Sequence, residues 1–363
     1  MARIISLKTI FAEIPFEDGG RGEGITPSRW HSFHTVLVRL EDEDGAVGWG
    51  EAFAYFCAPA VAAAVETMVA PLVVGKEIDD IPAWNLATQK ALHIFGRYGI
   101  TIFALSGVDI ALWDLKAKRA GKTLAELISP AARRDVPAYS SLVAYRDPEL
   151  VAKYARQSVE EGYGYVKLHE IAPDAISAAR PAMGAAAGLM VDVNCNWTPE
   201  FAIEMLPLLK AADTMWLEEP IFPPEDHETL ARLEAQGIPI GAGENACTAF
   251  PFHALAKSIA YPQPSLTKVG GVSVFLEVAR IAAEAGKALM PHSPYFGPGY
   301  FATLNLFAAL GEDSLFEFLY VKPHAFIGLD TPLPVGGRVA LPQGTGIGFA
   351  PDEDVIRTYG AGR

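Results

Sequence analysis

The chain has 363 residues, of which 50% are hydrophobic, with a formal net charge of −14 at pH 7 and a pI near 5.0. This length is sufficient for one large α/β domain and a smaller one. The excess of acidic residues argues against nucleic acid or an anionic membrane as a partner. The three cysteines include no CxxC pair, which is typical of a reducing compartment, and the longest apolar stretch is interrupted by Glu66 and Pro71. We therefore expect a soluble, cytoplasmic protein.

The first part of the chain alternates apolar and polar residues as antiparallel strands do, in residues 2–14 and 33–53. The segment EDEDGA at residues 41–46 predicts the turn of a hairpin. Helical patterns follow in residues 59–73, 82–95 and 103–121, and Gly121 is a plausible stop for the last of them. These patterns predict an α+β domain over residues 1–125.

From Val136 onward, short apolar runs alternate with helical stretches, which is typical of parallel strands joined by helices. Eight such units favour a closed barrel over an open sheet, and no dinucleotide-binding glycine motif is present. The last segment, residues 320–363, is rich in proline and glycine, and we expect it to pack back on the N-terminal domain. The predicted strands are 136–144, 164–170, 188–195, 214–220, 238–245, 264–271, 287–293 and 314–319.

Three carboxylates stand at equal intervals in this region: Asp192, Glu218 and Glu244 are 26 residues apart. Each lies at or near the end of a predicted strand, and the carboxyl ends of neighbouring parallel strands meet on one rim of a barrel. Three acids that converge in an apolar rim repel one another unless a cation neutralises them. Oxygen ligands suit a hard divalent ion, so the sequence predicts a Mg²⁺ site.

Motifs around these acids occur in a specific order: SGVDIALWDLKAKRAGKTLAELI, VDVNCNW, WLEEP, GAGEN and KVGGV. In that order they resemble the mandelate racemase/muconate-lactonising group of the enolase superfamily, and the resemblance covers essentially the whole chain. It implies an α/β fold, with a modified (β/α)7β TIM-type barrel over residues 130–319 and an α+β capping domain over residues 1–125 that the segment 320–363 completes. It also implies Mg²⁺ held by the three acids, and removal of the proton α to a substrate carboxylate to give a metal-stabilised enediolate. The residues expected to support the ligands are Asn194, Glu219 and Asn245.

The resemblance also implies positions for the acid and base groups. Lys167 and His169 are two residues apart at the end of the second barrel strand, so both side chains lie on the same face. His169 stands where the family often has a lysine base, and our hypothesis is that the charge of Lys167 keeps His169 neutral and able to accept a proton. On the other face we expect Lys268, at the end of strand six, or His292, at the end of strand seven. Family racemases pair this histidine with an aspartate, and Ser265 stands in its place here, which leaves the choice open. The acid expected to stabilise the enediolate is Glu317 in the eighth strand.

The remaining expectations concern substrate contacts and specificity. The glycine-rich loop of residues 16–30 predicts a mobile lid. Residues expected to contact substrate are Arg21, Arg29, Trp30, Tyr55, Tyr139 and Ser141.

These features favour a Mg²⁺-dependent dehydratase of a sugar acid or another small hydroxy acid, with a small carboxylate as its partner. A racemase or epimerase of a hydroxy acid or amino-acid derivative would use the same site and stays open. A barrel that binds metal and ligand without turnover is a third interpretation, whereas a hydrolytic zinc site is disfavoured because no histidine pair has ligand spacing. We expect a homo-oligomer of undetermined size.

Overall fold

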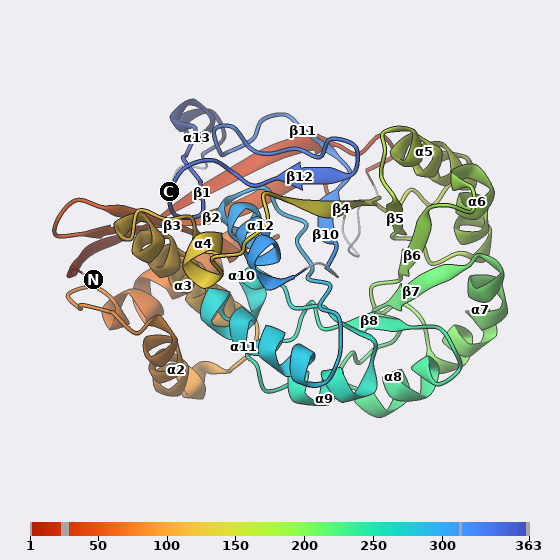
Figure 1. Cartoon of the computed structure of the whole chain (residues 1–363), viewed down its shortest axis with the longest axis horizontal. Helices are drawn as coiled ribbons and strands as arrows, with labels where there is room; N and C mark the ends of the chain where they lie inside the picture. Colours follow the sequence, from red (N-terminus) through yellow and green to blue (C-terminus); the bar gives the residue numbers. More distant parts are fainter. Residues whose placement is uncertain (1, 23–28, 312–313, 361–363) are drawn as a thin grey trace.

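The computed structural model describes residues 2–22, 29–311 and 314–360. It contains a four-stranded sheet in the order β11-β1-β2-β3 and a larger sheet in the order β10-β4-β5-β6-β7-β8-β9. Figure 1 shows the first sheet at one end of the molecule and the barrel strands, with helices arranged around them, at the other. Among the described residues, no helix is both long and apolar enough to cross a membrane.

The N-terminal sheet is an antiparallel meander of β1 (Ile4–Glu17), β2 (Ser32–Asp42) and β3 (Val47–Phe53). The predicted hairpin turn lies between β2 and β3, where Gly45 has a positive φ of 82°. Because β1 runs to Glu17, the predicted lid begins later than residue 16, and its residues 23–28 lie outside the described part of the chain. The helices of this region are α1 (Ala58–Ala64), the π-helix η1 (Val65–Val69), η2 (Ala70–Leu72), α2 (Ile81–Leu92), η3 (His93–Phe95), α3 (Ile100–Arg119) and α4 (Leu124–Ile128).

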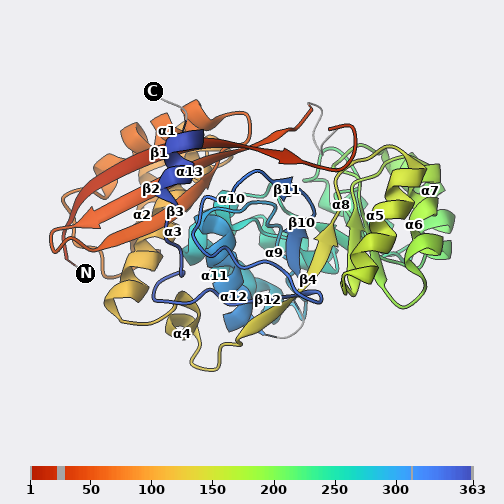
Figure 2. The ribbon, with the colours of Figure 1, turned by 90° about the horizontal axis from the view of Figure 1, so that it is seen from above.

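Helix α3 lies directly on strand β3 because glycines remove the side chains between them. A Cβ on Gly50 would lie 1.9 Å from the carbonyl oxygen of Gly107, and one on Gly48 would lie 2.2 Å from that of Ala111. Figure 2 shows α3 beside the sheet of β1, β2 and β3. Tyr55 and Phe56, which follow β3, line a cavity at the barrel mouth.

The barrel strands are parallel and lie side by side in chain order from β4 to β9, with β10 beside β4. Most of the predicted alternation of strand and helix is confirmed, including the helices after the first five strands. The elements are β4 (Asp135–Ser141), α5 (Pro148–Glu160), β5 (Tyr165–Leu168), α6 (Pro173–Met183), β6 (Gly188–Asp192), α7 (Pro199–Ala211), β7 (Thr214–Glu218), α8 (His227–Glu234), β8 (Ile240–Ala242), α9 (Phe252–Ser258), β9 (Tyr261–Pro262), α10 (Leu266–Val269), α11 (Gly271–Glu284), α12 (Pro298–Leu310) and β10 (Phe316–Leu319).

Two predicted strands are wrong in the structure. Residues 264–271 contain the short helix α10, and the strand itself is β9, which ends at Pro262. Residues 287–293 form no regular strand, and they join the barrel through the Met290 N–H bonded to Pro262 O (3.1 Å) and a bridge between Ser265 and His292. These two segments carry Lys268 and His292, which line a cavity at the barrel mouth.

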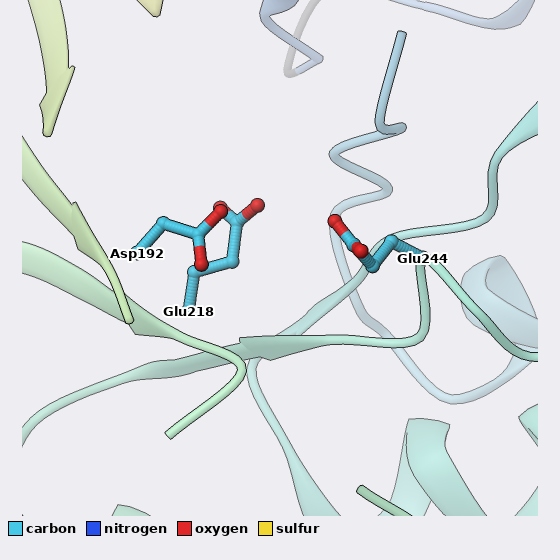
Figure 3. Close-up of side chains that lie close together, drawn as sticks. All are labelled: Asp192, Glu218 and Glu244. Atoms are coloured by element: carbon cyan, nitrogen blue, oxygen red, sulfur yellow. The ribbon is translucent and has the colours of Figure 1, made fainter. Parts of the chain in front are cut away.

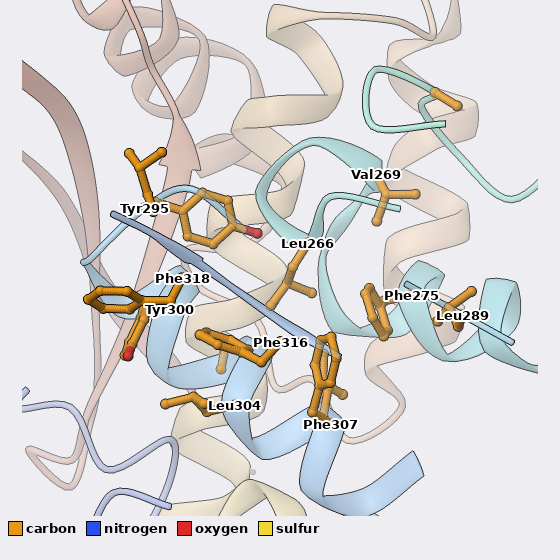
Figure 4. Close-up of a cluster of buried hydrophobic side chains, with 14 of the residues drawn as sticks. Leu266, Val269, Phe275, Leu289, Tyr295, Tyr300, Leu304, Phe307, Phe316 and Phe318 are labelled. Atoms are coloured by element: carbon orange, nitrogen blue, oxygen red, sulfur yellow. The ribbon is translucent and has the colours of Figure 1, made fainter. Parts of the chain in front are cut away.

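The C-terminal segment contacts both parts of the molecule. Strand β11 (Lys322–Pro323) pairs with β1, and β12 (Arg338–Ala340) pairs with β4. Helix α13 (Glu353–Tyr359) follows, and Gly360 forms a bridge with Ala12. Figure 4 shows an apolar core beside these elements, with side chains from α10, α11, α12 and β10 packed together.

Two buried carboxylates join the capping domain to the barrel. Glu51 of β3 accepts a hydrogen bond from Gly299 N (2.8 Å) in the first turn of α12, and Asp109 of α3 accepts one from Ser273 N (3.0 Å) in the first turn of α11. Burial raises the pKa of each carboxyl to about 7. The N–H groups of a helix start lack partners within the helix, so these acids satisfy them across the domain interface.

Candidate active site

The three predicted metal ligands converge at the mouth of the barrel. Carboxylate oxygens of Asp192, Glu218 and Glu244 all lie within 4.8 Å of one another, and the three residues are buried. Figure 3 shows Asp192 and Glu218 close together, with Glu244 facing them across a gap. Asp192 and Glu218 end β6 and β7 in matching register, and Glu244 follows two residues after β8. The spacing of 26 residues therefore corresponds to neighbouring strands.

Two basic side chains from β5 and its end neutralise the first side of this cluster. Lys167 Nζ lies 2.6 Å from Glu218 Oε1 and 3.5 Å from Asp192 Oδ2. His169 Nε2 lies 3.1 Å from Asp192 Oδ2, and its Nδ1 contacts the backbone oxygen of Leu142. A carbonyl oxygen only accepts, so Nδ1 donates to Leu142 O. Burial opposes a charge on His169, but Asp192 raises its pKa, so Nε2 carries a proton toward Asp192 and becomes a free acceptor only once His169 is neutral.

The other two predicted bases lie beside the third acid. His292 Nε2 is 3.0 Å from Glu244 Oε2, and Lys268 Nζ is 3.8 Å from Glu244 Oε1. Lys268 also donates to Asn245 Oδ1 (3.0 Å). His169 and the pair Lys268/His292 therefore contact opposite ends of the acid cluster. Ser265 and His292 are neighbours, but neither Ser265 Oγ nor His292 Nδ1 has a hydrogen-bond partner among the described residues.

The charges of these basic residues keep Asp192 and Glu244 ionised in a buried site, whereas burial raises the pKa of Glu218 to about 8 against the charge of Lys167. Burial alone would raise the pKa of Asp192, but the charges of His169 and Lys167 bring it below its usual range. Burial acts in the same way on Glu244, where His292 and Lys268 hold the pKa well below that range. Conversely, burial opposes the charge of Lys167, and Glu218 and Glu317 raise its pKa well above its ordinary value. The site thus offers anionic oxygens at neutral pH.

Glu317 in β10 completes the polar floor. Its Oε1 lies 2.9 Å from Lys167 Nζ and accepts from Ser141 Oγ (2.8 Å), while its Oε2 accepts from Ser293 N (2.8 Å). Burial opposes ionisation, but Lys167 and His292 lower the pKa of Glu317 to about 2. Glu317 is therefore ionised and can accept hydrogen bonds.

The residues expected to support the ligands lie beside them. The backbone N–H of Asn194 donates to Asp192 Oδ1 (2.8 Å), and Asn245 Nδ2 donates to Glu244 Oε1 (3.0 Å). Glu219 Oε1 accepts from the backbone of Gly243 (2.8 Å) and of Glu244 (3.3 Å), which orients the third ligand through its main chain. Such supporting contacts restrict the orientation of metal ligands.

Sequence reasoning missed two donors below the cluster. Gln263 Nε2 and Trp216 Nε1 both donate to Glu218 Oε2, each at 2.8 Å. Tyr139 and Ser141, which were expected to contact substrate, lie at this lower level: Tyr139 packs edge-on against Trp216, and Ser141 is bonded to Glu317. Gln263 directly follows the two-residue strand β9 and stands between two prolines, so its partner could not be read from spacing.

A cavity of about 430 Å³ opens above the acids. Trp30 and Tyr55, both predicted to contact substrate, line it, whereas Arg29 is exposed and Arg21 forms an ion pair with Asp147 (3.3 Å) on the barrel side. The lining residues are Trp30, Phe53, Tyr55, Phe56, Arg146, His169, Asn194, Asn196, Glu244, Asn245, Lys268, His292, Pro294 and Glu317.

The cluster fits a divalent cation of the Mg²⁺ type. All three ligands are carboxylates, which suit hard cations. Glu244 Oε2 is buried and has no well-aligned hydrogen bond among the described residues, although His292 Nε2 lies 3.0 Å away. A buried anionic oxygen that is incompletely hydrogen-bonded is a group that a cation would satisfy.

Comparisons with known proteins agree with this geometry. The model of the mandelate racemase / muconate lactonizing enzyme N-terminal domain matches residues 26–129, and the enolase C-terminal domain-like model matches residues 150–355. The chain is 30% identical to the 3,6-anhydro-alpha-L-galactonate cycloisomerase of Streptomyces coelicolor, covering 88% of this chain and 90% of that protein. It is 33% identical to the L-talarate/galactarate dehydratase of Salmonella typhimurium, covering 71% and 67%.

Among solved structures, a racemase from Streptomyces coelicolor with bound magnesium superposes with a TM-score of 0.89 and 28% identity, covering 99% of this chain and 100% of that one. The two family models together extend over most of the chain, and the fold agrees over its whole length. The chain therefore belongs to the mandelate racemase/muconate lactonizing enzyme family, a branch of the enolase superfamily.

Proposed function

We propose that this protein is a Mg²⁺-dependent dehydratase of a sugar acid. The observation that carries the proposal is the placement of His169 at one end of the acid cluster and of Lys268 and His292 at the other. Elimination of water needs a base for the α-proton and an acid for the departing hydroxyl, and groups at opposite ends can act on adjacent carbons of one substrate.

Asp192, Glu218 and Glu244 would hold the cation, which when bound polarises the substrate carboxylate and stabilises negative charge that develops on its oxygens. His169 Nε2 accepts the α-proton, because Nδ1 is engaged by Leu142 O. Lys167, fixed between Glu218 and Glu317, keeps a positive charge beside the carboxylate.

On the opposite side, His292 or Lys268 donates a proton to the β-hydroxyl, which leaves as water. The enol that results rearranges to a 2-keto acid. Glu317 lines the cavity and is ionised, so we assign it to accepting a hydrogen bond from a substrate hydroxyl rather than to contact with the carboxylate itself. The aromatic side chains of Trp30 and Phe53 shield this chemistry from solvent.

The test is incubation of the Mg²⁺-loaded protein with a panel of sugar acids in D₂O, followed by mass spectrometry and detection of 2-keto acids. A product lighter by one water supports the dehydratase. Absence of turnover and of α-deuterium exchange across the panel would contradict it.

Two alternatives use the same proton abstraction. A racemase or epimerase, which the opposed bases also favour, would introduce deuterium at the α-carbon with inversion and without loss of water. The similarity to a cycloisomerase favours a second outcome, in which a ring opens or closes and the product keeps the substrate's composition apart from exchanged deuterium. The same mass spectra separate these reactions.

A further inference from the structure

Arg146 is a cation of the cavity wall that the chemistry above does not use. It lies in the loop after β4 and lines the cavity, and its side chain is exposed. The other lining cations contact acids, since Lys268 and His292 both lie beside Glu244. Within residues 2–22, 29–311 and 314–360, the guanidinium of Arg146 forms no ion pair, so its charge is available to a ligand.

The loop holds Arg146 in an unusual backbone conformation. Its φ is 53°, in the left-handed region that side chains with a Cβ rarely adopt. The buried carboxylate of Glu170 maintains this conformation by accepting hydrogen bonds from Tyr145 N (2.7 Å) and Arg146 N (3.0 Å). Strained backbone that neighbouring groups hold in place occurs preferentially at ligand sites.

The position of Arg146 relative to the acids suits the far end of a substrate. Arg146 and His169 follow β4 and β5, which are adjacent strands, so Arg146 stands on the His169 side of the cavity. The acid cluster forms the buried floor, whereas Arg146 is exposed at the rim. A substrate whose reacting carboxylate lies on the floor directs its other end toward this rim.

We infer that the substrate carries a second carboxylate at that end, and that Arg146 binds it. This inference rests on the proposed function and narrows its substrate class to sugar diacids. A planar guanidinium can pair with a carboxylate through two parallel hydrogen bonds, whereas a terminal hydroxyl offers no charge and no matching geometry. In a chain of net charge −14, a dianion needs such a local cation to bind.

The experiment uses matched acid pairs. Hexarates and hexonates with the same configuration at C2 to C5 differ only at C6, which is a carboxylate in one and a hydroxymethyl group in the other. Wild type, Arg146→Met and the control Arg156→Met are compared on each pair; Arg156 is exposed on α5, outside the cavity lining. We expect Arg146→Met to lower kcat/KM for the preferred hexarate by about 10- to 100-fold, mainly through KM. In Arg146→Met, kcat/KM for the matching hexonate should change by less than about threefold. Arg156→Met should leave kcat/KM unchanged for both acids.

Calorimetric binding in a His169→Asn background gives a second readout that does not require turnover. There, Arg146→Met should weaken hexarate binding by the same factor and spare hexonate binding. Equal losses for both acids, or a wild-type preference for hexonates, would overturn the inference while leaving the dehydratase intact. Turnover of neither acid, together with a charge-dependent difference in binding, would instead refute the dehydratase and retain the second-carboxylate site.

Discussion

Gln263 donates a hydrogen bond to Glu218 from below the cavity, with Nε2 and Oε2 separated by 2.8 Å. Trp216, two residues before Glu218 on β7, donates to the same oxygen. Both donors are neutral, so they orient the carboxylate without cancelling its charge. The other oxygen, Oε1, is left to face Lys167 and the remaining acids.

We therefore expect Gln263→Leu to reduce the affinity for Mg²⁺ by about 10- to 100-fold, as other losses of support behind a metal ligand do. The reason is that Glu218 would lose one of two donors that fix its orientation. Isothermal titration calorimetry with Mg²⁺ measures the change, with Gln157→Leu as the control because Gln157 lies on α5, outside the cavity lining, and donates to Glu161. A folded Gln263→Leu protein with wild-type Mg²⁺ affinity would show that Trp216 alone is sufficient.

Binding of the cation should also stabilise the fold. Mg²⁺ at about 100 times its Kd stabilises a protein that binds it only when folded by about 2.7 kcal/mol. We expect a higher Tm with Mg²⁺ than with a chelator for the wild type, and no such difference for Glu244→Gln, which removes a ligand charge. Differential scanning fluorimetry measures both, and Glu204→Gln, an exposed change on α7, should behave as wild type. A Mg²⁺-dependent rise in Tm that persists in Glu244→Gln would place the cation elsewhere.

The two histidines should have separable roles. His169→Asn is expected to slow exchange of the substrate α-proton with D₂O by about 10²–10⁴-fold, because the base that accepts it is gone. His292→Asn should slow loss of water by a similar factor while α-proton exchange continues. Proton NMR in D₂O follows exchange, and a 2-keto acid assay follows dehydration. If His169→Asn retains full exchange, the base is on the opposite face.

The domain interface should respond to pH through Glu51. Burial raises the pKa of Glu51 from 4.5 to about 7, so between these values the folded state binds a proton that the unfolded state has released. The contribution of Glu51 to the free energy of unfolding thus falls as pH rises through this window, by about 3 kcal/mol, and is constant outside it. Glu51→Gln keeps an acceptor for Gly299 N but does not titrate, so its stability should decline less from pH 4.5 to pH 7. Urea unfolding across this range compares the two slopes, and parallel curves would mean that Glu51 stays ionised throughout.

The convergence of the three candidate metal ligands could be predicted because it depends on local repetition. Asp192 and Glu218 end successive barrel strands and Glu244 follows the next one, so acids separated by one strand–helix unit in the chain become neighbours in space. The strand predicted around Lys268 was wrong for a local reason: Gly270 and Gly271 have φ values of 123° and 80°, and they allow a short helix to end and α11 to begin at once.

Other features arise only from tertiary contacts. Gln263 meets Glu218 across 45 residues, and Glu170 meets the backbone of Arg146 across 24. Neither pair belongs to a periodic pattern, so a single sequence contains no signal that joins them. His292 was expected in the site and lines the cavity, but it does so from an irregular segment attached by a few hydrogen bonds and not from the predicted strand.

The carboxylates that cross the domain boundary constrain how this architecture can be recombined. A chimera that joins residues 1–125 to a foreign barrel keeps Glu51 and Asp109. Each of these acids still needs a barrel helix that begins at the same position and donates a backbone N–H to it. A mismatch deprives each buried acid of its donor from the barrel and leaves a helix start without an acceptor, and both are costly. Exchange of whole capping domains between relatives should therefore succeed only where the barrel keeps the two helix starts that bind Glu51 and Asp109. The capping domain and the barrel would then be inherited together as one unit.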